Sequence, residues 1–198
     1  DWRLPTREEL RSIVHYGNSA PAISETYFPN SSLQEYWTSD AAVYYAQGDE
    51  QKWRINFLSG RDFAAFLSTK GAVRAVRGAN SQTDYTDNED GTVTDGSTGL
   101  MWVQAPSAGP MSWKDALAYC EDFSHGGYTD WRLPDIKELA SLADLTGSGP
   151  AIDAEYFPET LSEKYWSSTT YVRTFVDAWT VDFQDGIAGV SDKQGELY

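Results

Sequence analysis

The stretch Asp1-Trp2-Arg3-Leu4-Pro5 returns later in the chain as Asp130-Trp131-Arg132-Leu133-Pro134, and the residues that follow the two stretches continue to match. Residues 1–39 align without a gap with residues 130–168, with 18 identities in 39 positions. After a length difference of three residues the match resumes, so that residues 53–57 correspond to residues 179–183. Because similarity over such a length requires a shared backbone, the sequence predicts one fold present twice, as a tandem repeat.

The two copies are complementary fragments of that fold. The first copy ends in a strand-like segment, residues 72–77, that has no counterpart after Tyr198, and the second copy carries residues 85–129, which the first lacks. We therefore expect a first domain over residues 1–78 without its N-terminal hairpin and first helix. It is followed by a small, polar linker over residues 79–84 and by a second domain over residues 85–198, which is expected to lack its closing strand. A fragment of a longer array is favoured over strand exchange between neighbouring molecules.

The part of the second copy that precedes its repeated motif has strong local signals. Residues 85–104 alternate β-branched or apolar stretches with Gly-containing turns, which is typical of short antiparallel strands. After Ser112, apolar residues recur at helical spacing and predict a helix with Cys120 on its buried stripe.

A second helix is expected after each Asp-Trp-Arg-Leu-Pro motif. Thr6 with Glu9, and Asp135 with Glu138, have the spacing of a capping box at a helix N-terminus. Short alternating segments follow in both copies and predict antiparallel strands. Each complete unit is thus expected to be an α+β domain of two helices packed on short antiparallel strands.

The chain is strongly acidic, and the acidic excess is confined to one part. It has 15 Lys and Arg against 30 Asp and Glu, for a formal net charge of −15. Residues 1–78 hold 9 basic and 9 acidic side chains, whereas residues 79–198 hold 6 and 21. Such a surface repels phosphate backbones and anionic lipid, so nucleic acid is not an expected partner. No apolar run approaches the roughly 20 residues of a bilayer span, so membrane insertion is not expected either.

The eight tryptophans allow two interpretations. A pocket lined with aromatic rings could stack on the apolar faces of sugars. Side chains that recur in both copies are more often part of the core, which we favour. Six of the eight are such repeated residues, namely Trp2 with Trp131, Trp37 with Trp166 and Trp53 with Trp179.

Asp87, Asp90 and Asp95 surround Gly91 and are the candidate ligands of a calcium ion, because Ca²⁺ prefers several carboxylate oxygens. The register does not fit an EF-hand, since the first loop position would be Thr86. A solvated hairpin turn is the favoured interpretation, and no other cofactor is indicated.

Candidate catalytic groups are few. His15 and His125 are the two histidines, and His15 is replaced by Asp144 in the other copy. Neither has a Ser or Cys partner at a spacing that suggests an activated nucleophile. The sequence therefore predicts a protein that is not an enzyme.

A series of motifs in fixed order runs through the second copy: Asp90 to Asp95, Thr98 to Trp102, Trp113 to Cys120, Gly127 to Pro134, Tyr156-Phe157-Pro158, Tyr165 to Thr169 and Trp179 to Gly186. This series resembles the C-terminal domain family of the Legionella collagen-like protein. The resemblance covers most of one domain in residues 85–198 and the later two-thirds of another in residues 1–78. The family is similar to C-type-lectin-like folds, and the repeated motif followed by a helix also resembles formylglycine-generating enzymes.

The resemblance implies a secreted or cell-surface bacterial module, often joined to further repeats. The protein that gives the family its name is an adhesin that binds sulfated glycosaminoglycans. In this chain a basic face for such a polyanion could come from the first copy alone, through Arg54, Arg61, Lys70, Arg74 and Arg77.

The resemblance also implies a disulfide bond. In the family a helix cysteine, here Cys120, usually has a partner in a closing Val-Arg-Cys-Val-Arg strand. Cys120 is therefore expected to form a disulfide with a cysteine beyond Tyr198, and Ala75 stands at that place in the first copy. Enzymes of the formylglycine-generating kind need a catalytic cysteine pair, which a single cysteine does not supply.

The candidate ligand-binding surface follows Tyr165-Trp166, where polar and aromatic side chains alternate and the two copies diverge. Its members are Ser167, Ser168, Thr169, Tyr171 and Arg173. Divergence is also typical of an unconstrained loop, which the sequence slightly favours. The leading function is a non-enzymatic extracellular or cell-surface module that binds a glycan or protein ligand and promotes adhesion. The alternative is a structural subunit of an extracellular filament or surface layer, built by repeated domain docking and self-association.

Overall fold

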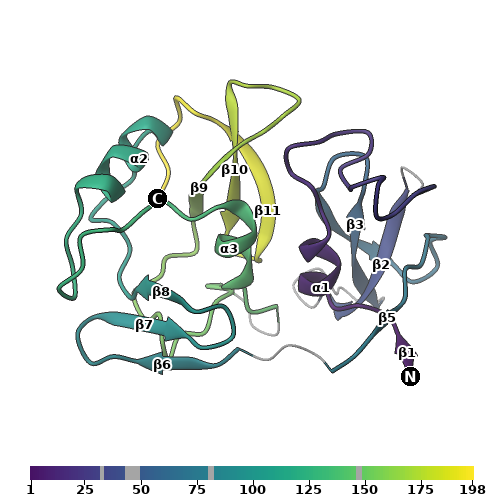
Figure 1. Cartoon of the computed structure of the whole chain (residues 1–198), viewed down its shortest axis with the longest axis horizontal. Helices are drawn as coiled ribbons and strands as arrows, with labels where there is room; N and C mark the ends of the chain where they lie inside the picture. Colours follow the sequence, from purple (N-terminus) through teal and green to yellow (C-terminus); the bar gives the residue numbers. More distant parts are fainter. Residues whose placement is uncertain (32–33, 43–49, 80–82, 146–148) are drawn as a thin grey trace.

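The computed structural model of the 198-residue chain describes residues 1–31, 34–42, 50–79, 83–145 and 149–198 (Figure 1). Short helices and small antiparallel sheets alternate along the chain, which confirms the predicted α+β class. Part of the predicted linker, residues 80–82, lies outside the described residues.

The first segment, residues 1–77, has one helix and two small sheets. Strands β2, β3 and β4 form one antiparallel sheet in that order, and β1 pairs antiparallel with β5. The elements are β1 (Trp2–Arg3), α1 (Arg7–Ser12), β2 (Glu35–Ala41), β3 (Gln51–Asn56), β4 (Asp62–Phe66) and β5 (Val76–Arg77).

The second segment, residues 85–198, begins with the predicted antiparallel strands and a helix whose N-cap is Ser112. Its later strands form another antiparallel sheet, in the order β11-β10-β9. The elements are β6 (Tyr85–Asp87), β7 (Thr92–Asp95), β8 (Leu100–Val103), α2 (Trp113–Asp122), α3 (Ile136–Ser141), β9 (Lys164–Thr170), β10 (Asp177–Asp182) and β11 (Ile187–Asp192).

Corresponding elements of the two segments begin and end at aligned residues. Helix α3 begins and ends 129 residues after α1, β9 lies 129 residues after β2, and β10 lies 126 residues after β3. Both helices start in a capping box, as the sequence predicts, formed by Thr6 with Glu9 and by Asp135 with Glu138. The sequence match therefore extends to the backbone.

The tryptophans of the repeated motif differ in their surroundings. Trp2 is 71% exposed, whereas Trp131 contacts the rings of Phe123 and Tyr128 and donates its indole N–H to the carbonyl oxygen of His125 at 3.2 Å. The prediction of a core position is therefore wrong for Trp2, whose ring is exposed.

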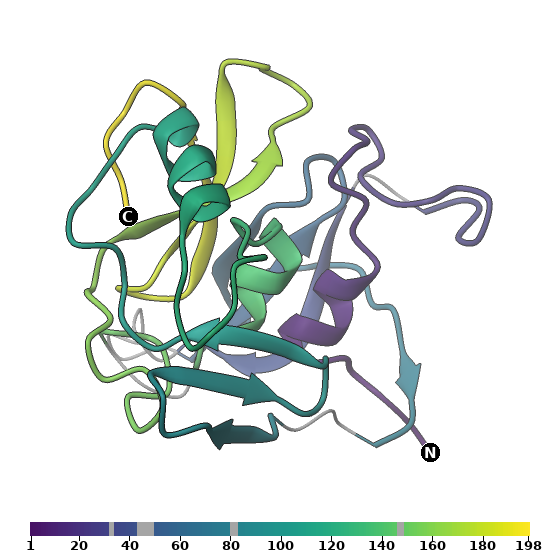
Figure 2. The ribbon, with the colours of Figure 1, turned by 60° about the vertical axis from the view of Figure 1, so that its left-hand side comes forward.

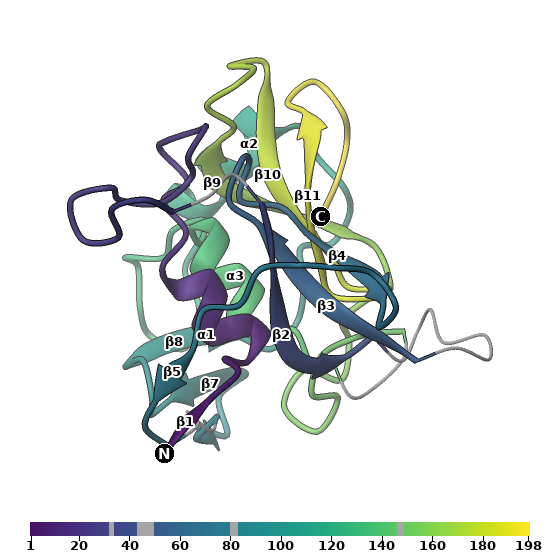
Figure 3. The same cartoon turned by 90° about the vertical axis from the view of Figure 1, so that its right-hand side faces the viewer.

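The two segments share one hydrophobic core. Helices α1 and α3 contact each other, and β4 contacts β11 (Figures 1 and 3). Each helix also lies against its own sheet, α1 on β2 and β3 and α3 on β9 and β10. One continuous cluster of buried side chains includes Leu10, Tyr16, Ile55 and Phe57 from the first segment and Leu139, Trp179, Val181 and Phe183 from the second.

A buried ion cluster lies where the segments meet. One carboxylate oxygen of Asp62 accepts hydrogen bonds from both Arg7 and Arg11, and the other accepts from the backbone N–H of Ala188 at 3.2 Å. Arg7 also donates to the carbonyl oxygen of Gly186 at 2.6 Å. All three charged side chains are buried, so each guanidinium depends on Asp62 for its counter-charge.

Burial and pairing shift the pKa values of this cluster in opposite directions. Burial raises the pKa of the Asp62 carboxyl, but the two guanidinium groups outweigh it and hold the pKa below its usual value. Burial lowers the pKa of Arg7 to about 10. Asp62 is therefore ionised and Arg7 protonated at neutral pH.

Candidate functional site

Two of the candidate ligand residues, Ser167 and Thr169, make hydrogen bonds inside the fold. Ser167 is fully buried, and its hydroxyl donates to the carbonyl oxygen of Trp179 at 2.9 Å. Thr169 accepts a 3.1 Å hydrogen bond from the backbone N–H of Ile136 and so contacts the first turn of α3. Both side chains therefore hold β9 to its neighbours.

The backbone of Ser168 and the side chain of Tyr171 also make contacts inside the fold. The backbone N–H of Ser168 donates to the carbonyl oxygen of Pro134 at 2.8 Å. Tyr171 is 8% exposed, and its ring packs edge-on against Trp179 at 5.3 Å. Among the five candidate residues, Arg173 is the exposed one.

The exposed part of this region is the tip of the β9–β10 loop, residues 173–176. Phe175 and Val176 are 77% and 65% exposed, next to Arg173. Lys193 donates from its ammonium group to the carbonyl oxygen of Phe175 at 3.0 Å, and from its backbone N–H to that of Val176 at 3.0 Å. The sequence did not single out Phe175 or Val176, although two adjacent apolar residues inside a divergent loop are a detectable signal.

The candidate calcium ligands are engaged in turns. Asp87 and Asp90 each accept a hydrogen bond from the backbone N–H two residues further on. Asp95 is buried and accepts from the hydroxyl groups of Ser97 and Thr98; burial raises its pKa, but these bonds outweigh it and lower the pKa. Within the described ranges, no three His, Cys, Asp or Glu side chains are grouped as a metal ion would require.

One of the basic side chains of the first segment, that of Arg54, is engaged in contacts inside the fold. Arg54 is 1% exposed; it pairs with Glu35 at 2.7 Å and lies over the ring of Trp37 at 4.0 Å. A face for a polyanion would therefore lack Arg54.

An apolar groove of about 490 Å³ lies between β8, α2 and residues 131–134; we call it the α2 groove. Ala116 is the buried residue of α2, and Cys120 is partly exposed. The prediction of a buried stripe is thus wrong for Cys120, because the stripe faces an open groove. Six of the lining residues are Trp102, Cys120, Phe123, Trp131, Leu133 and Tyr165.

Burial raises the pKa of the Cys120 thiol. A raised pKa keeps the group in its less reactive thiol form at neutral pH. His125 donates from Nε2 to the carbonyl oxygen of Gly91 at 3.3 Å, and its ring stacks on Phe123 at 5.8 Å.

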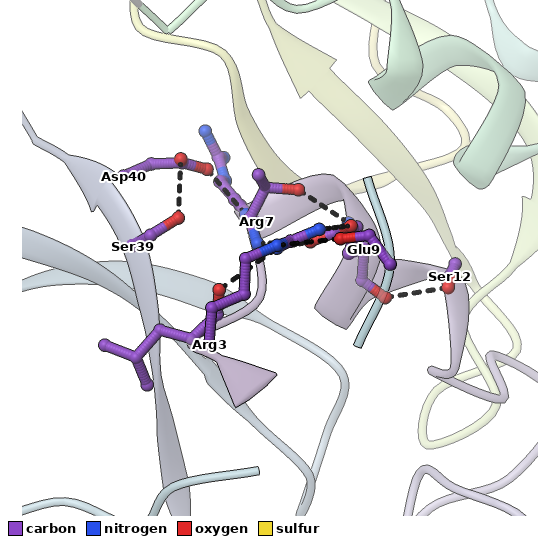
Figure 4. Close-up of polar contacts among 9 residues, drawn as sticks. Arg3, Arg7, Glu9, Ser12, Ser39 and Asp40 are labelled. Carbon is purple, nitrogen blue, oxygen red and sulfur yellow. Dashed lines mark hydrogen bonds and ion pairs between the residues drawn. The ribbon is translucent and has the colours of Figure 1, made fainter. Parts of the chain in front are cut away.

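Arg132, one of the groove-lining residues 131–134, makes the same ion pair as its counterpart in the first segment, Arg3. Arg3 donates two hydrogen bonds to the carboxylate of Glu9, at 2.6 and 2.7 Å (Figure 4). Arg132 donates two to Glu138, both at 2.6 Å. Arg132 is therefore fixed in the position that Arg3 takes beside β5.

Tyr198 lines the α2 groove and makes the same backbone hydrogen bonds as its counterpart in the first segment, Ala72. The N–H of Ala72 donates to the carbonyl oxygen of Glu35 at 2.9 Å, and its own carbonyl oxygen accepts from Trp37 at 3.0 Å. Tyr198, which corresponds to Ala72, repeats both bonds with Lys164 and Trp166, at 3.1 and 2.6 Å.

The fold defines a small α+β module of two segments with matching elements and a shared core. The chain belongs to the Lcl C-terminal domain family, whose model matches residues 1–77 and 91–198. Two matched segments are consistent with two incomplete copies of the family domain. Membership indicates a module that works at the cell surface or in the extracellular space.

No curated protein and no solved structure matches the chain, so the similarity to C-type-lectin-like folds stays a prediction. Among the described residues, no helix is long and apolar enough to cross a membrane.

Proposed function

We propose that the chain is a non-enzymatic module of the bacterial surface or extracellular space that binds a glycan or protein ligand through the β9–β10 loop tip. The observation that carries this proposal is the exposure of Phe175 and Val176, at 77% and 65%. Large apolar side chains this exposed, on a protein that works among other molecules, are typical of contact surfaces.

The backbone of the tip is fixed before any ligand arrives. The N–H of Tyr171 donates to the carbonyl oxygen of Asp177 at 3.0 Å, and the N–H of Asp177 donates to Thr174 at 3.0 Å. The ammonium group of Lys193 clamps the tip against Thr170 at 2.8 Å. A preorganised loop loses little conformational entropy on binding, which favours affinity.

The side chains of the tip suit a neutral sugar. An exposed phenyl ring, here Phe175, can stack on the apolar face of a pyranose, and the guanidinium of Arg173 can donate to its hydroxyl groups. The acidic excess of residues 79–198 repels sulfated glycans, so a neutral glycan is the better candidate.

Binding to a glycan array and to immobilised extracellular-matrix proteins tests this proposal. Phe175→Ser is expected to reduce binding at least about tenfold without a change in melting temperature, because the ring contacts solvent. The matched control is Phe66→Ser, which removes a ring that is 48% exposed in the first segment. Equal binding by the parent chain and Phe175→Ser would remove the loop tip from the proposal.

Calcium is not part of the proposed mechanism, because the candidate carboxylates already accept hydrogen bonds within turns. Thermal unfolding with and without millimolar Ca²⁺ is expected to give the same melting temperature. A rise that is lost in Asp90→Asn would establish a calcium site instead.

A second candidate function is a structural subunit of an extracellular assembly. The observation that favours it is the open α2 groove, an apolar surface of the kind at which polypeptides dock. Electron microscopy of the native material would reveal filaments or layers if assembly is the function, and separate particles if it is not.

A further inference from the structure

The two segments meet through equivalent faces that carry different side chains. Helix α1 lies beside its counterpart α3 (Figure 2), and β4 contacts its counterpart β11. Within this contact Asp62 accepts a hydrogen bond from the backbone N–H of Ala188, the residue that aligns with it. Contacts between aligned residues mean that one face of each segment meets the same face of the other.

Charge and volume distinguish the two faces. The first segment contributes what we call the charged face, formed by Arg7, Arg11 and Asp62. The second segment contributes the apolar face, formed at the aligned positions by Ile136, Ala140 and Ala188. The side chains of both faces are buried, so the difference lies inside the interface.

The apolar face supplies hydrogen-bond acceptors to the charged face. Two guanidinium groups share one carboxylate, so the charged face carries one net positive charge. Arg7 donates to the carbonyl oxygen of Gly186 at 2.6 Å. Arg11 donates at 3.0 Å to the carbonyl oxygen of Ala140, which the small alanine side chain leaves accessible. The second segment therefore accepts the hydrogen bonds that Asp62 alone does not provide for.

A carboxylate of the second segment adds to this complementarity. Burial lowers the pKa of Arg7, and the negative charges of Asp62 and Asp185 act in the opposite direction. Asp185 belongs to the second segment, and the first segment has Ser59 at the aligned position. A second charged face would therefore not offer this charge to the cluster.

A lysine at the edge of the interface distinguishes the segments in the same sense. The ammonium group of Lys137 in α3 donates at 2.7 Å to the carbonyl oxygen of Ser12, the last residue of α1. Carbonyl groups at a helix C-terminus attract positive charge. The first segment has Glu8 at the position of Lys137, so a pair of first segments would bring a carboxylate to these carbonyl groups.

Pairs of like faces are disfavoured for two different reasons. Two charged faces would bury two clusters of net positive charge against each other, and buried charges without counter-charges are strongly destabilising. Two apolar faces would leave empty the volume that Arg7, Arg11 and Asp62 occupy, and cavities in a core are destabilising. The pair of unlike faces avoids both costs.

We propose that these residues determine which copies of the domain pair with each other. The charged face accepts as its partner a copy with small or apolar side chains at the places of Ile136, Ala140 and Ala188, and disfavours a second charged face. Because each face is used up in the pair, this interface closes at two copies, and a larger assembly would need other surfaces. The inference concerns the pairing of copies and does not depend on the proposed ligand binding.

The test compares the thermal unfolding of three variants of the 198-residue chain. In the first, the second segment receives the charged residues through Ile136→Arg, Ala140→Arg and Ala188→Asp. Its melting temperature is expected to fall by at least about 10 °C, because two charged faces then meet. A neutral control of similar volume has Ile136→Met, Ala140→Met and Ala188→Asn, and is expected to lose less than half as much.

The third variant exchanges the two faces. It combines the three substitutions of the charged variant with Arg7→Ile, Arg11→Ala and Asp62→Ala, so that a charged face again meets an apolar one. We expect it to regain at least half of the melting temperature that the charged variant loses. A purely local role for each side chain would not produce this recovery, because six buried positions are then changed instead of three.

A separate pair of variants tests the edge of the interface. Lys137→Glu is expected to lower the melting temperature by about 2–4 °C, because it brings a carboxylate to the C-terminal carbonyl groups of α1. Lys114→Glu makes the same change of charge at an exposed lysine of α2 and is expected to shift the melting temperature by less than about 1 °C.

Equal losses in the charged variant and its neutral control would overturn the proposal, because packing alone would then account for the effect. An exchanged chain that is no more stable than the charged variant would overturn it as well. If Lys137→Glu has no larger effect than Lys114→Glu, the edge contact takes no part in the selection of the partner. Loss of ligand binding in Phe175→Ser bears on the proposed function alone, so the two proposals fail separately.

Discussion

Arg11 donates a 3.0 Å hydrogen bond from its guanidinium to the carbonyl oxygen of Ala140, the residue that holds the same position in the second segment. The ion cluster contains another such pair, because the carboxylate of Asp62 accepts from the backbone N–H of Ala188, its own counterpart. Contacts between corresponding residues are the mark of a two-fold interface between like units. The segments therefore meet as two subunits of a symmetric dimer would, with the charged residues on one side.

Asp62→Ala is expected to destabilise the chain by about 3–5 kcal/mol, because it leaves two buried guanidinium groups without a counter-charge. Urea unfolding followed by tryptophan fluorescence measures the loss. Glu25→Gln, at an exposed carboxylate, is the control and should change the free energy of unfolding by less than about 0.5 kcal/mol. A loss of that small size in Asp62→Ala would contradict the assigned role of the cluster.

A triple variant that gives the first segment the residues of the second, Arg7→Ile, Arg11→Ala and Asp62→Ala, is expected to be more stable than Asp62→Ala alone. It removes the unpaired charges together with the carboxylate, and apolar replacements of buried ion clusters are often tolerated. The same urea series ranks the two proteins. If the triple variant is the less stable of the two, the cavity left by the arginine side chains outweighs the unpaired charge.

The stability of the chain is expected to depend on pH through Asp62. Its pKa is lower in the folded protein than the ordinary value of 3.8, so the unfolded chain binds the proton more tightly. The stabilisation is present above about pH 4 and is lost as the pH falls through the folded-state pKa. Unfolding measured from pH 7 to pH 2 should show this loss in the parent and a shallower one in Asp62→Asn.

The two capping boxes are expected to contribute equally. Glu9→Ala and Glu138→Ala each remove a carboxylate that accepts the N-cap backbone N–H at 2.8 Å and that also pairs with an arginine. Each should cost about 1 kcal/mol. Unequal losses, well beyond the error of thermal unfolding, would contradict the equivalence of α1 and α3.

Local features of the fold could be predicted from the sequence because they depend on neighbouring residues. The capping boxes at Thr6 and Asp135, the helix after Ser112 and the strands of residues 85–104 follow from short-range spacing. The burial of Arg7, Arg11 and Asp62 could not, because charged side chains are ordinarily exposed. The one available signal was their replacement by Ile136, Ala140 and Ala188 in the other copy.

The candidate ligand surface was only partly predictable for a similar reason. Ser167, Thr169 and Tyr171 are polar or aromatic, but their partners come from other elements, which the sequence does not place beside them. The α2 groove could not be predicted either, because its lining residues come from β8, α2 and residues 131–134, which are separated in the sequence.

The most direct test of the central claim, that the two segments follow one plan and meet as two like subunits would, is a crystal structure of the chain. The account predicts that α1, β2 and β3 superimpose on α3, β9 and β10, with Arg11 against Ala140 and Asp62 against Ala188. Segments with unlike backbones, or an interface at which other residues meet, would contradict it.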